Sequence, residues 1–247
     1  MTTPRFYLTS KELKKGVAVL SGEQFHHLVR VRRGRVGDKV RVFDEQGREF
    51  EGKVSEIRKD RAVILLVEKC LISAPPSIEI TLLQALPKGR KMDLIVQKTT
   101  ELGVWKIIPL ITERTIVRLP RPDRVARWNR IALESCRQSQ RRSIPLVSPI
   151  TRLEELDLAS LSGLKIILCE GAERGLKEAL KGTTENKVVL MVGPEGGWSP
   201  REIELSLQWG FITAGLGRRI LRTETAGIIG VALVQYERGD LGFSLTL

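Results

Sequence analysis

The sequence predicts an α/β protein in two parts, a small β-barrel followed by a mainly parallel sheet covered by helices. Up to residue 72, apolar residues come in short runs divided by turns, whereas from residue 78 strand-like and helix-like segments alternate. Two adjacent prolines in the segment 73–77 mark a linker. We therefore expect a barrel domain over residues 1–72 and a second domain over residues 73–247.

The first part carries the barrel pattern and a group of arginines. Its strand-like runs are residues 16–20, 38–44, 48–57 and 61–69. The segment 26–40 reads as a helix end and a turn, and its arginines are candidates for RNA phosphate contacts: Arg30, Arg32, Arg33 and Arg35. The adjacent His26 and His27 are interpreted as capping or packing residues rather than catalysts.

The second part alternates strands with helices. The expected strands are residues 78–86, 106–111, 165–170, 188–192 and 211–216. Helices are expected over 91–103, with Gly103 as its C′ cap, over 123–142 and around 175–181. This alternation predicts a parallel sheet whose ligands bind at the carboxyl ends of the strands.

Two glycine-bearing loops near the C-terminus are the most informative functional signal. The first, GPEGG at 193–197, follows a β-branched run and precedes Ser199, Pro200 and Glu202, which predict a capped helix start. Adjacent glycines leave no Cβ between the backbone and a ligand. The alternative is a plain strand-to-helix turn, for which one glycine usually suffices.

The second loop begins at Gly217 and is basic. Its arginines are Arg218, Arg219 and Arg222. Thr223 or Thr225 is expected to cap the last helix. Leucine, isoleucine and glycine backbone can form a slot for a flat heterocycle, and arginine can bind an anion. The alternative is a solvated basic turn, which the apolar Ile220 and Leu221 disfavour.

The net charge of +12 is unevenly distributed. Residues 88–142 carry 14 basic and 5 acidic side chains, whereas residues 143–247 carry 11 basic and 13 acidic ones. A nearly neutral part beside a basic part is expected if one holds a small ligand and the other meets a polyanion. Because the charge is grouped, nucleic acid is favoured over a solvated face or a membrane surface.

Several classes of protein are disfavoured. No apolar run approaches the roughly 20 residues needed to span a bilayer, and the N-terminus lacks the apolar core of a signal peptide. Cys70, Cys136 and Cys169 are scattered, so neither a zinc site nor a disulfide framework is expected, and a cytoplasmic location fits best. With no metal motif or activated nucleophile, positioning of a reactive cofactor against a substrate remains.

Five motifs in order carry a resemblance. They are QKTTELGV (97–104), ERT (113–115), ESCRQSQRRSIP (134–145), GPEGGWSPREIE (193–204) and LGRRILRTETA (216–226). Over essentially its whole length the chain resembles the bacterial 16S ribosomal RNA uracil-N3-methyltransferase family of the SPOUT class. The resemblance implies a PUA-like barrel, a C-terminal α/β domain with a deep trefoil knot, a homodimer and S-adenosylmethionine as methyl donor. The alternatives are a SPOUT enzyme for ribose 2′-hydroxyls or tRNA, and a non-catalytic RNA-binding relative.

The resemblance also implies site residues. The cofactor slot would be formed by Leu168, Glu170, Gly171, Gly193, Pro194, Glu195, Gly196, Gly197, Leu216, Gly217, Ile220, Leu221, Thr223 and Thr225. Arg222, with Glu224 nearby, is the catalytic candidate, because uracil N3 reacts as an anion whose charge an arginine can stabilise. Two interpretations stay open for Glu195 and Glu224: each is a candidate proton acceptor, or it holds a loop by hydrogen bonding.

Three further motif residues are expected on the RNA side: Arg114, Gln138 and Arg141. The chain departs from the family at two positions. The family usually has glycine where Gln140 stands and an aliphatic residue where Arg32 stands. The first departure concerns the loop geometry beside Arg141, and the second adds charge to the barrel.

Overall fold

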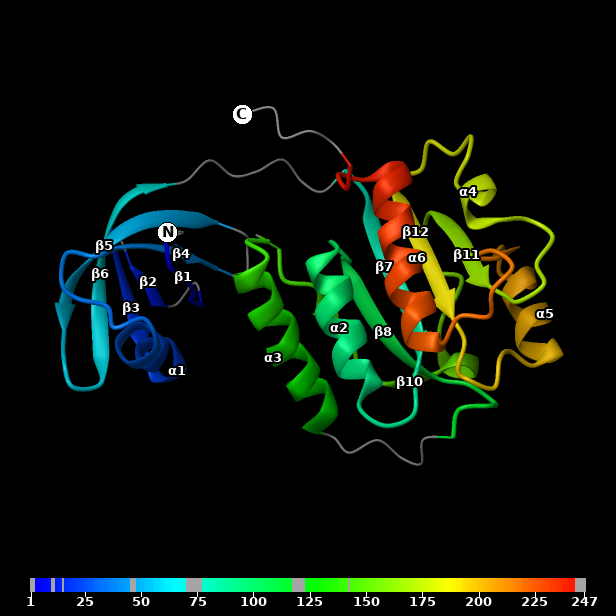
Figure 1. Cartoon of the computed structure of the whole chain (residues 1–247), viewed down its shortest axis with the longest axis horizontal. Coiled ribbons are helices and arrows are strands. Elements are labelled where there is room, and N and C mark those ends of the chain that lie inside the picture. The colour runs from blue at the N-terminus through cyan, green and yellow to red at the C-terminus, as the bar shows by residue number, and fades with distance from the viewer. Residues whose placement is uncertain are drawn as a thin grey trace. The chain divides into compact units, whose positions relative to one another are not determined.

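A computed structural model describes residues 3–9, 12–14, 16–44, 48–69, 77–116, 123–141 and 143–242 (Figure 1). The chain divides into two compact units. The N-terminal unit comprises residues 1–74 together with 136–144, and the C-terminal unit comprises residues 75–135 and 145–247. The predicted linker residues 73–76 and Cys70 lie outside the described residues.

The N-terminal unit contains a curled six-stranded sheet (Figure 1). Its strands, in sheet order, are β1 (Arg5–Tyr7), β4 (Lys39–Phe43), β5 (Glu49–Ile57), β6 (Arg61–Lys69), β3 (Val17–Ser21) and β2 (Leu13–Lys14). Only β1 and β4 pair in parallel. The four predicted strands are confirmed. The sheet is a half-barrel rather than a closed one, and β1 and β2 were not predicted because they are only two or three residues long.

The core of this unit follows the period of two expected of half-buried strands. Ala18 and Leu20 of β3 are fully buried, while Ser21 is exposed. A short helix α1 (Gly22–His26) and a π-helical turn η2 (His27–Val31) add Phe25 and Leu28 to the same cluster. The ring of His27 packs edge-on against that of Phe6, 5.8 Å between centroids, which supports the packing role predicted for this histidine.

A buried arginine ties residues 136–144 into the N-terminal unit. Arg5 Nε donates to Glu49 Oε1 at 3.0 Å, and both side chains are more than nine-tenths buried. The guanidinium also lies 3.8 Å from the centroid of the Phe43 ring and donates to the carbonyls of Cys136 and Arg141 at 3.1 and 2.7 Å. A charge taken out of water needs such partners, so Arg5 and Glu49 hold this segment specifically.

The C-terminal unit is built on a parallel sheet of seven strands. In sheet order they are β10 (Thr151–Arg152), β8 (Lys106–Ile111), β7 (Glu79–Ala85), β12 (Lys187–Val192), β11 (Leu164–Leu168) and β13 (Ile212–Ala214), with β9 (Leu146–Val147) also on β8. Every pairing is parallel. The predicted parallel sheet is confirmed; β9 and β10 are two-residue strands that the pattern did not reveal.

Both faces of this sheet are covered. Its helices are α2 (Lys91–Glu101), α3 (Asp123–Gln138), α4 (Leu176–Ala179), α5 (Pro200–Gln208) and α6 (Thr223–Arg238), with a 3₁₀ turn η3 (Leu153–Glu155). Leu82 and Leu190 belong to the core under α2 and α6, whereas their strand neighbours Leu83 and Met191 belong to the core under α5. This alternation explains why the strands read as continuous apolar runs.

Two helix ends test the predicted boundaries. The helix predicted over 91–103 ends at Glu101, and Gly103 follows with φ 95°, so the predicted glycine cap is confirmed. The helix predicted over 123–142 ends at Gln138 instead. Gln140 then adopts a left-handed conformation with φ 59°, which is why this position favours glycine.

The described residues contain neither a membrane-spanning helix nor a cluster of metal-binding side chains. Within the ranges given above, no helix has both the length and the apolar content to cross a membrane. Nor do three or more histidine, cysteine, aspartate or glutamate side chains of those residues gather where they could hold a metal ion.

Candidate active site

The loops that follow β11, β12 and β13 enclose a cavity of about 530 Å³, the main pocket. Because these neighbouring strands are parallel, their carboxyl ends meet at one edge of the sheet. The lining residues are Arg114, Leu168, Cys169, Glu170, Val192, Gly193, Pro194, Glu195, Gly196, Gly197, Trp198, Ile203, Leu216, Gly217, Arg219, Ile220, Leu221, Arg222, Thr223 and Ala226.

The main pocket brings together most of the residues predicted for the cofactor slot. Gly171 and Thr225 are the two predicted members that do not line it. Arg222 lines it, but Glu224 does not. Arg114, expected on the RNA side, is part of the wall. Sequence reasoning missed Val192, Trp198, Ile203 and Ala226, which are ordinary apolar residues without a local chemical signal.

The end of the first loop is held by a capping box. Ser199 Oγ accepts from the Glu202 amide at 3.2 Å, and Glu202 Oε2 accepts from the Ser199 amide at 2.9 Å. The other oxygen of Glu202 accepts from the Glu113 amide at 2.8 Å. The predicted cap is therefore confirmed, and the buried Glu202 also joins this loop to the segment after β8.

The start of the loop has no room for a side chain. A Cβ on Gly193 would lie 3.0 Å from the Trp198 ring, tighter than ordinary van der Waals contact. The ring is fixed because Trp198 Nε1 donates to the Leu168 carbonyl at 2.9 Å. The glycine at this position therefore lets the Trp198 ring pack across the carboxyl ends of the paired strands β11 and β12.

The predicted cap of the last helix is wrong. The N-cap of α6 is Arg222, without a side-chain capping bond, and Thr223 is the first helical residue. The Thr223 hydroxyl instead donates to the Gly193 carbonyl at 2.5 Å and accepts from Gln84 Nε2 at 3.0 Å. The Thr223 hydroxyl thus bonds to residues far away in sequence instead of capping the helix. Its bond to Gly193 joins the two loops.

A lysine lies between the two carboxylates predicted as proton acceptors. Lys91 Nζ is 3.4 Å from Glu195 Oε1 and 3.1 Å from Glu224 Oε1. Glu195 also accepts from the Lys88 amide at 3.0 Å. Burial raises the pKa of Glu195, but backbone amides and the Lys91 ammonium outweigh it, so the pKa lies below its ordinary value of 4.5. Glu195 is therefore ionised at neutral pH.

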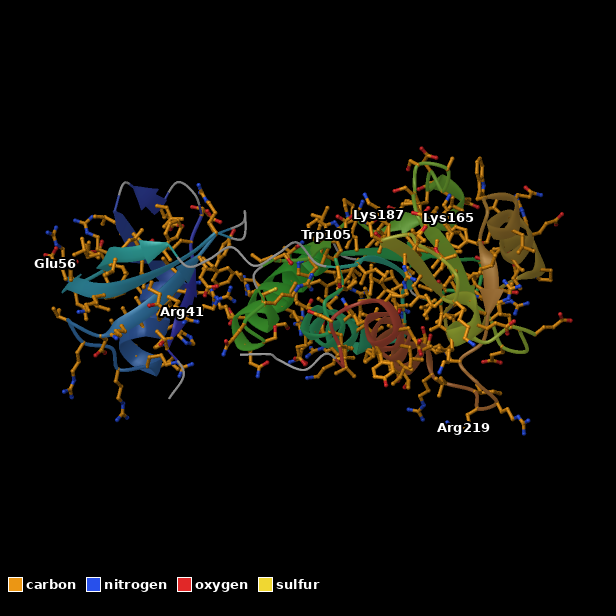
Figure 2. The ribbon with its side chains drawn as sticks, turned by 90° about the horizontal axis from the view of Figure 1, so that it is seen from above. Arg41, Glu56, Trp105, Lys165, Lys187 and Arg219 are labelled. Atoms are coloured by element: carbon orange, nitrogen blue, oxygen red, sulfur yellow. The ribbon has the colours of Figure 1, made fainter. Side chains whose placement is uncertain are left out.

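Three arginines surround the main pocket. Arg114 Nη1 donates to the Gly196 carbonyl at 3.0 Å, so it braces the first loop. Arg219 and Arg222 are exposed, and no described residue bonds with either guanidinium. Arg219 extends away from the ribbon (Figure 2). Arg219 and Arg222 are therefore available to an anionic ligand.

The thiol in the pocket wall is a poor nucleophile. Burial raises the pKa of Cys169 to about 11, so the thiol is neutral near pH 7. A neutral, half-buried thiol reacts far more slowly than a thiolate. This chemistry argues against a covalent intermediate on Cys169.

The remaining RNA candidates lie in the N-terminal unit. The four arginines between residues 30 and 35 are all exposed. Arg33 has φ 53°, a left-handed conformation that is uncommon for a side-chain residue and occurs preferentially at functional sites. Gln138 is exposed at the end of α3, and Arg141 is half-buried.

Comparison with protein families identifies the class. Residues 74–235 match the family model described as an RNA methyltransferase domain, and residues 20–67 match the one described as an RNA methyltransferase PUA domain. The chain thus combines a parallel sheet that carries glycine loops at its carboxyl edge with a curled sheet that matches a PUA domain, and the two matches identify it as an RNA methyltransferase.

Curated relatives and solved structures narrow the class. The chain is 30% identical to ribosomal RNA small subunit methyltransferase E from Bacillus subtilis, over 94% of this chain and 97% of that protein. It is 33% identical to the protein of the same name from Aquifex aeolicus, over 91% and 96%. The chain belongs to the ribosomal RNA small subunit methyltransferase E family.

Two solved structures have the same architecture. One is ribosomal RNA small subunit methyltransferase E from Neisseria gonorrhoeae bound to S-adenosyl methionine, with TM-score 0.86 and 34% identity over 97% of this chain and 100% of that one. The other is a putative methyltransferase from Legionella pneumophila in complex with the same cofactor, with TM-score 0.87 and 31% identity over 98% and 100%.

Proposed function

We propose that the protein is an S-adenosylmethionine-dependent methyltransferase that modifies N3 of a specific uridine in 16S ribosomal RNA. The main pocket is the observation that carries the proposal. It combines glycine backbone, aliphatic walls and two available arginines at the carboxyl edge of a parallel sheet. Relatives named ribosomal RNA small subunit methyltransferase E support the RNA substrate.

The residues present fit S-adenosylmethionine. A volume of about 530 Å³ lies within the range of pockets for ligands of this size. Leu168, Leu216 and Ile220 can enclose a flat adenine, while the backbone of the first loop offers hydrogen bonds beside them. When bound, the cofactor supplies a methyl group on a positively charged sulfur.

Arg222 is proposed as the catalytic residue. Uracil N3 carries a proton and becomes nucleophilic only when that proton leaves, which places negative charge on the flanking carbonyl oxygens. Arg222 lines the pocket, and its guanidinium has no partner among the described residues. A guanidinium aimed at those oxygens stabilises the anion in a site partly shielded from water.

Neither Glu195 nor Glu224 is proposed as the proton acceptor. Both carboxylates are held by Lys91, and Glu224 does not line the pocket. Their role is to hold the first loop and the start of α6 in place. We propose that the N3 proton leaves to solvent at the mouth of the pocket while Arg222 holds the anion.

The N-terminal unit is proposed to hold the RNA backbone. Its arginine group is exposed, and such side chains contact phosphates without reading sequence. The Arg32 departure adds one charge to this surface. Residues 1–72 would then act as the RNA-binding domain and residues 73–247 as the catalytic domain, which the resemblance also assigns a deep trefoil knot.

We also propose a homodimer formed through α2 and α6. These neighbouring helices leave large apolar side chains exposed: Leu94, Ile229, Leu233 and Tyr236. The last three recur at helical spacing and form one stripe along α6. A second copy of the chain can cover such a stripe symmetrically. Because the substrate is ribosomal, the proposal places the enzyme in the cytoplasm.

Mass mapping of 16S ribosomal RNA from a deletion strain tests the proposal. Loss of one N3-methyluridine, restored by the wild-type gene, is the expected result. Loss of a ribose or tRNA methyl group instead would establish the same chemistry on another substrate. Unchanged methylation of all RNA would leave only the non-catalytic RNA-binding alternative.

A further inference from the structure

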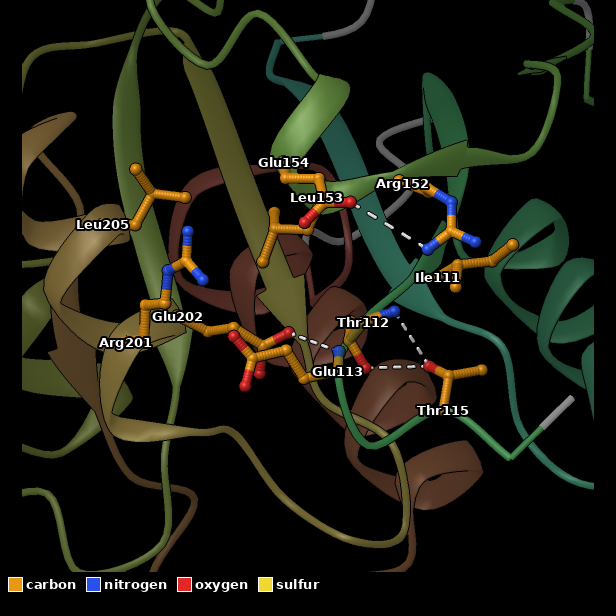
Figure 3. A pocket seen from close by; sticks show the side chains of 10 residues that line it. All are labelled: Ile111, Thr112, Glu113, Thr115, Arg152, Leu153, Glu154, Arg201, Glu202 and Leu205. Carbon is orange, nitrogen blue, oxygen red and sulfur yellow. Dashed lines mark hydrogen bonds and ion pairs between the residues drawn. The ribbon is translucent and has the colours of Figure 1, made fainter.

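A second cavity, of about 330 Å³, lies at the carboxyl end of β8 (Figure 3). We call it the second pocket. It is lined by Ile111, Thr112, Glu113, Thr115, Arg152, Leu153, Glu154, Arg201, Glu202 and Leu205. These residues come from the end of β8 and the turn that follows it, from β10, from η3 and from the first turns of α5. None of them has a role in the reaction proposed above.

Two arginines face this cavity from different elements. Arg201 comes from α5 and Arg152 from β10, and Figure 3 shows them on opposite sides of Leu153. The guanidinium group of Arg201 bonds with no described residue. Among the residues that the structure describes, the Arg152 guanidinium reaches only Glu154, at 3.9 Å, and both of those side chains are more than half exposed. An ion pair this long and exposed is weak, so both guanidinium groups are available to a ligand.

The carboxylates of the second pocket argue against a site for phosphate alone. Both oxygens of Glu202 are used by backbone amides. Glu113 and Glu154 remain, so two carboxylates face two guanidinium groups. Ile111, Leu153 and Leu205 add an apolar surface. An arginine can bind a phosphate, and a carboxylate can accept a hydrogen bond from the exocyclic amino group of a base. The ring of that base can pack on the aliphatic surface. Together these features match one nucleotide.

The second pocket adjoins the main pocket through a single turn. Thr112 and Thr115 close this turn with a hydroxyl pair at 2.7 Å. Within it, Glu113 lines the second pocket, while Arg114 lines the main pocket and bonds to the Gly196 carbonyl. Both cavities therefore open along the same edge of the sheet, and a single strand of RNA passing along that edge can enter both.

We propose that the second pocket binds a nucleotide of single-stranded RNA next to the target uridine, with its phosphate on Arg152 and Arg201. This inference rests on the proposed function, because it assumes that the main pocket takes a uridine. Recognition of an unstacked neighbour is how proteins commonly read single-stranded RNA. The second pocket would then determine which uridine is methylated.

The variants Arg201→Ala and Arg152→Ala test this proposal. The probe is a synthetic RNA spanning the mapped uridine, titrated by fluorescence anisotropy at several salt concentrations. Each variant should weaken RNA binding about tenfold, as expected for a lost charge-assisted hydrogen bond, and lower the salt slope by about 0.7. Calorimetry should show S-adenosylmethionine affinity unchanged within twofold. The matched control is Lys181→Ala, an exposed cation outside both pockets.

A second measurement identifies the nucleotide. In a series of RNAs, each lacking the base at one position beside the uridine, one member should bind the wild type more weakly than the intact RNA does. The same missing base should reduce the affinity of Arg201→Ala by a smaller factor. Unchanged RNA affinity and salt slope in both variants would overturn the inference. The inference would also be overturned if the variants changed the sedimentation coefficient of the protein but not its RNA affinity, because a second protein copy would then cover the cavity.

Binding and methylation can fail separately. A wild type that methylates this RNA, with variants that bind it normally, refutes the second pocket alone. A wild type that binds without methylating, with binding still dependent on Arg201, refutes the proposed reaction and supports the pocket.

Discussion

The two loops of the main pocket are held in opposite ways. In the loop 193–197, Thr223 and Arg114 bond to glycine carbonyls, and Lys88 and Lys91 hold Glu195. In the loop 217–222, the guanidinium groups of the arginines have no partner among the described residues, and Ile220 is 78% exposed. One wall is thus formed in advance, while the other awaits contacts from a cofactor, an RNA or a second subunit.

Among the substitutions in the two loops, replacement of Arg222 should have the largest effect, and the effect should be on turnover. If the second loop acts on the substrate, Arg222→Ala should lower turnover by about 10² or more, by analogy with the loss of one oxyanion donor. Affinity for S-adenosylmethionine should stay within a few-fold, as measured by calorimetry. Abolished cofactor binding would make Arg222 part of the cofactor wall instead.

Removing the carboxylate of Glu202 should break the preformed wall. Glu202→Ala leaves the amides of Ser199 and Glu113 without partners, so we expect a loss of about 1–3 kcal/mol in the free energy of unfolding. Denaturant titration measures it. Glu202→Gln keeps the capping geometry and should recover most of the loss, while the exposed Glu204→Ala should change little. If all three variants had the same free energy of unfolding, the capping box would not be what holds the loop.

Glu195 should give a smaller, pH-dependent effect. Its folded pKa is depressed, so its bonds to Lys88 and Lys91 contribute fully above about pH 4.5 and are lost as the pH falls through the folded pKa. Glu195→Gln should weaken S-adenosylmethionine binding about twofold to fivefold, in line with a partly exposed ion pair. Calorimetry from pH 7 to pH 4 should show a decline for the wild type and a flatter profile for the variant. Identical profiles would contradict the bracing role.

The open loop should tolerate substitution best. Ile220→Ser removes an exposed side chain that packs against little, so the free energy of unfolding should change by less than about 0.5 kcal/mol. Thermal unfolding of the monomeric fraction measures this. A larger loss would show that this loop, too, is held by packing before any ligand binds.

Local sequence patterns predicted the longer helices and strands well, but they did not predict which distant residues bond to one another. The Ser199 cap and the Gly103 helix end follow from neighbouring residues and are confirmed. Thr223 has the right residue type for a cap, yet its hydroxyl bonds to Gly193 and Gln84, which lie far away in sequence. Strands of two residues, such as β9, carry no readable period and exist because β8 offers them an edge.

The candidate site shows the same division. The two glycine loops and their arginines were readable because glycine and arginine have few substitutes at a ligand-binding backbone. Lys91 was not readable, because nothing near it in sequence indicates that it lies between Glu195 and Glu224. Gln140 was noticed only as a departure from the family, and the structure supplies the reason in its left-handed backbone.

The sequence by itself determined the two-part α/β organisation, the parallel sheet and the pair of loops, since these depend on residue period, propensity and turn chemistry within short windows. Only the tertiary structure decided which carboxylates are already paired, which arginines remain available and that a second pocket adjoins the first. Those facts depend on contacts between residues far apart in the chain, such as Glu202 with Glu113 and Arg114 with Gly196. Such contacts follow from packing, which no local pattern encodes.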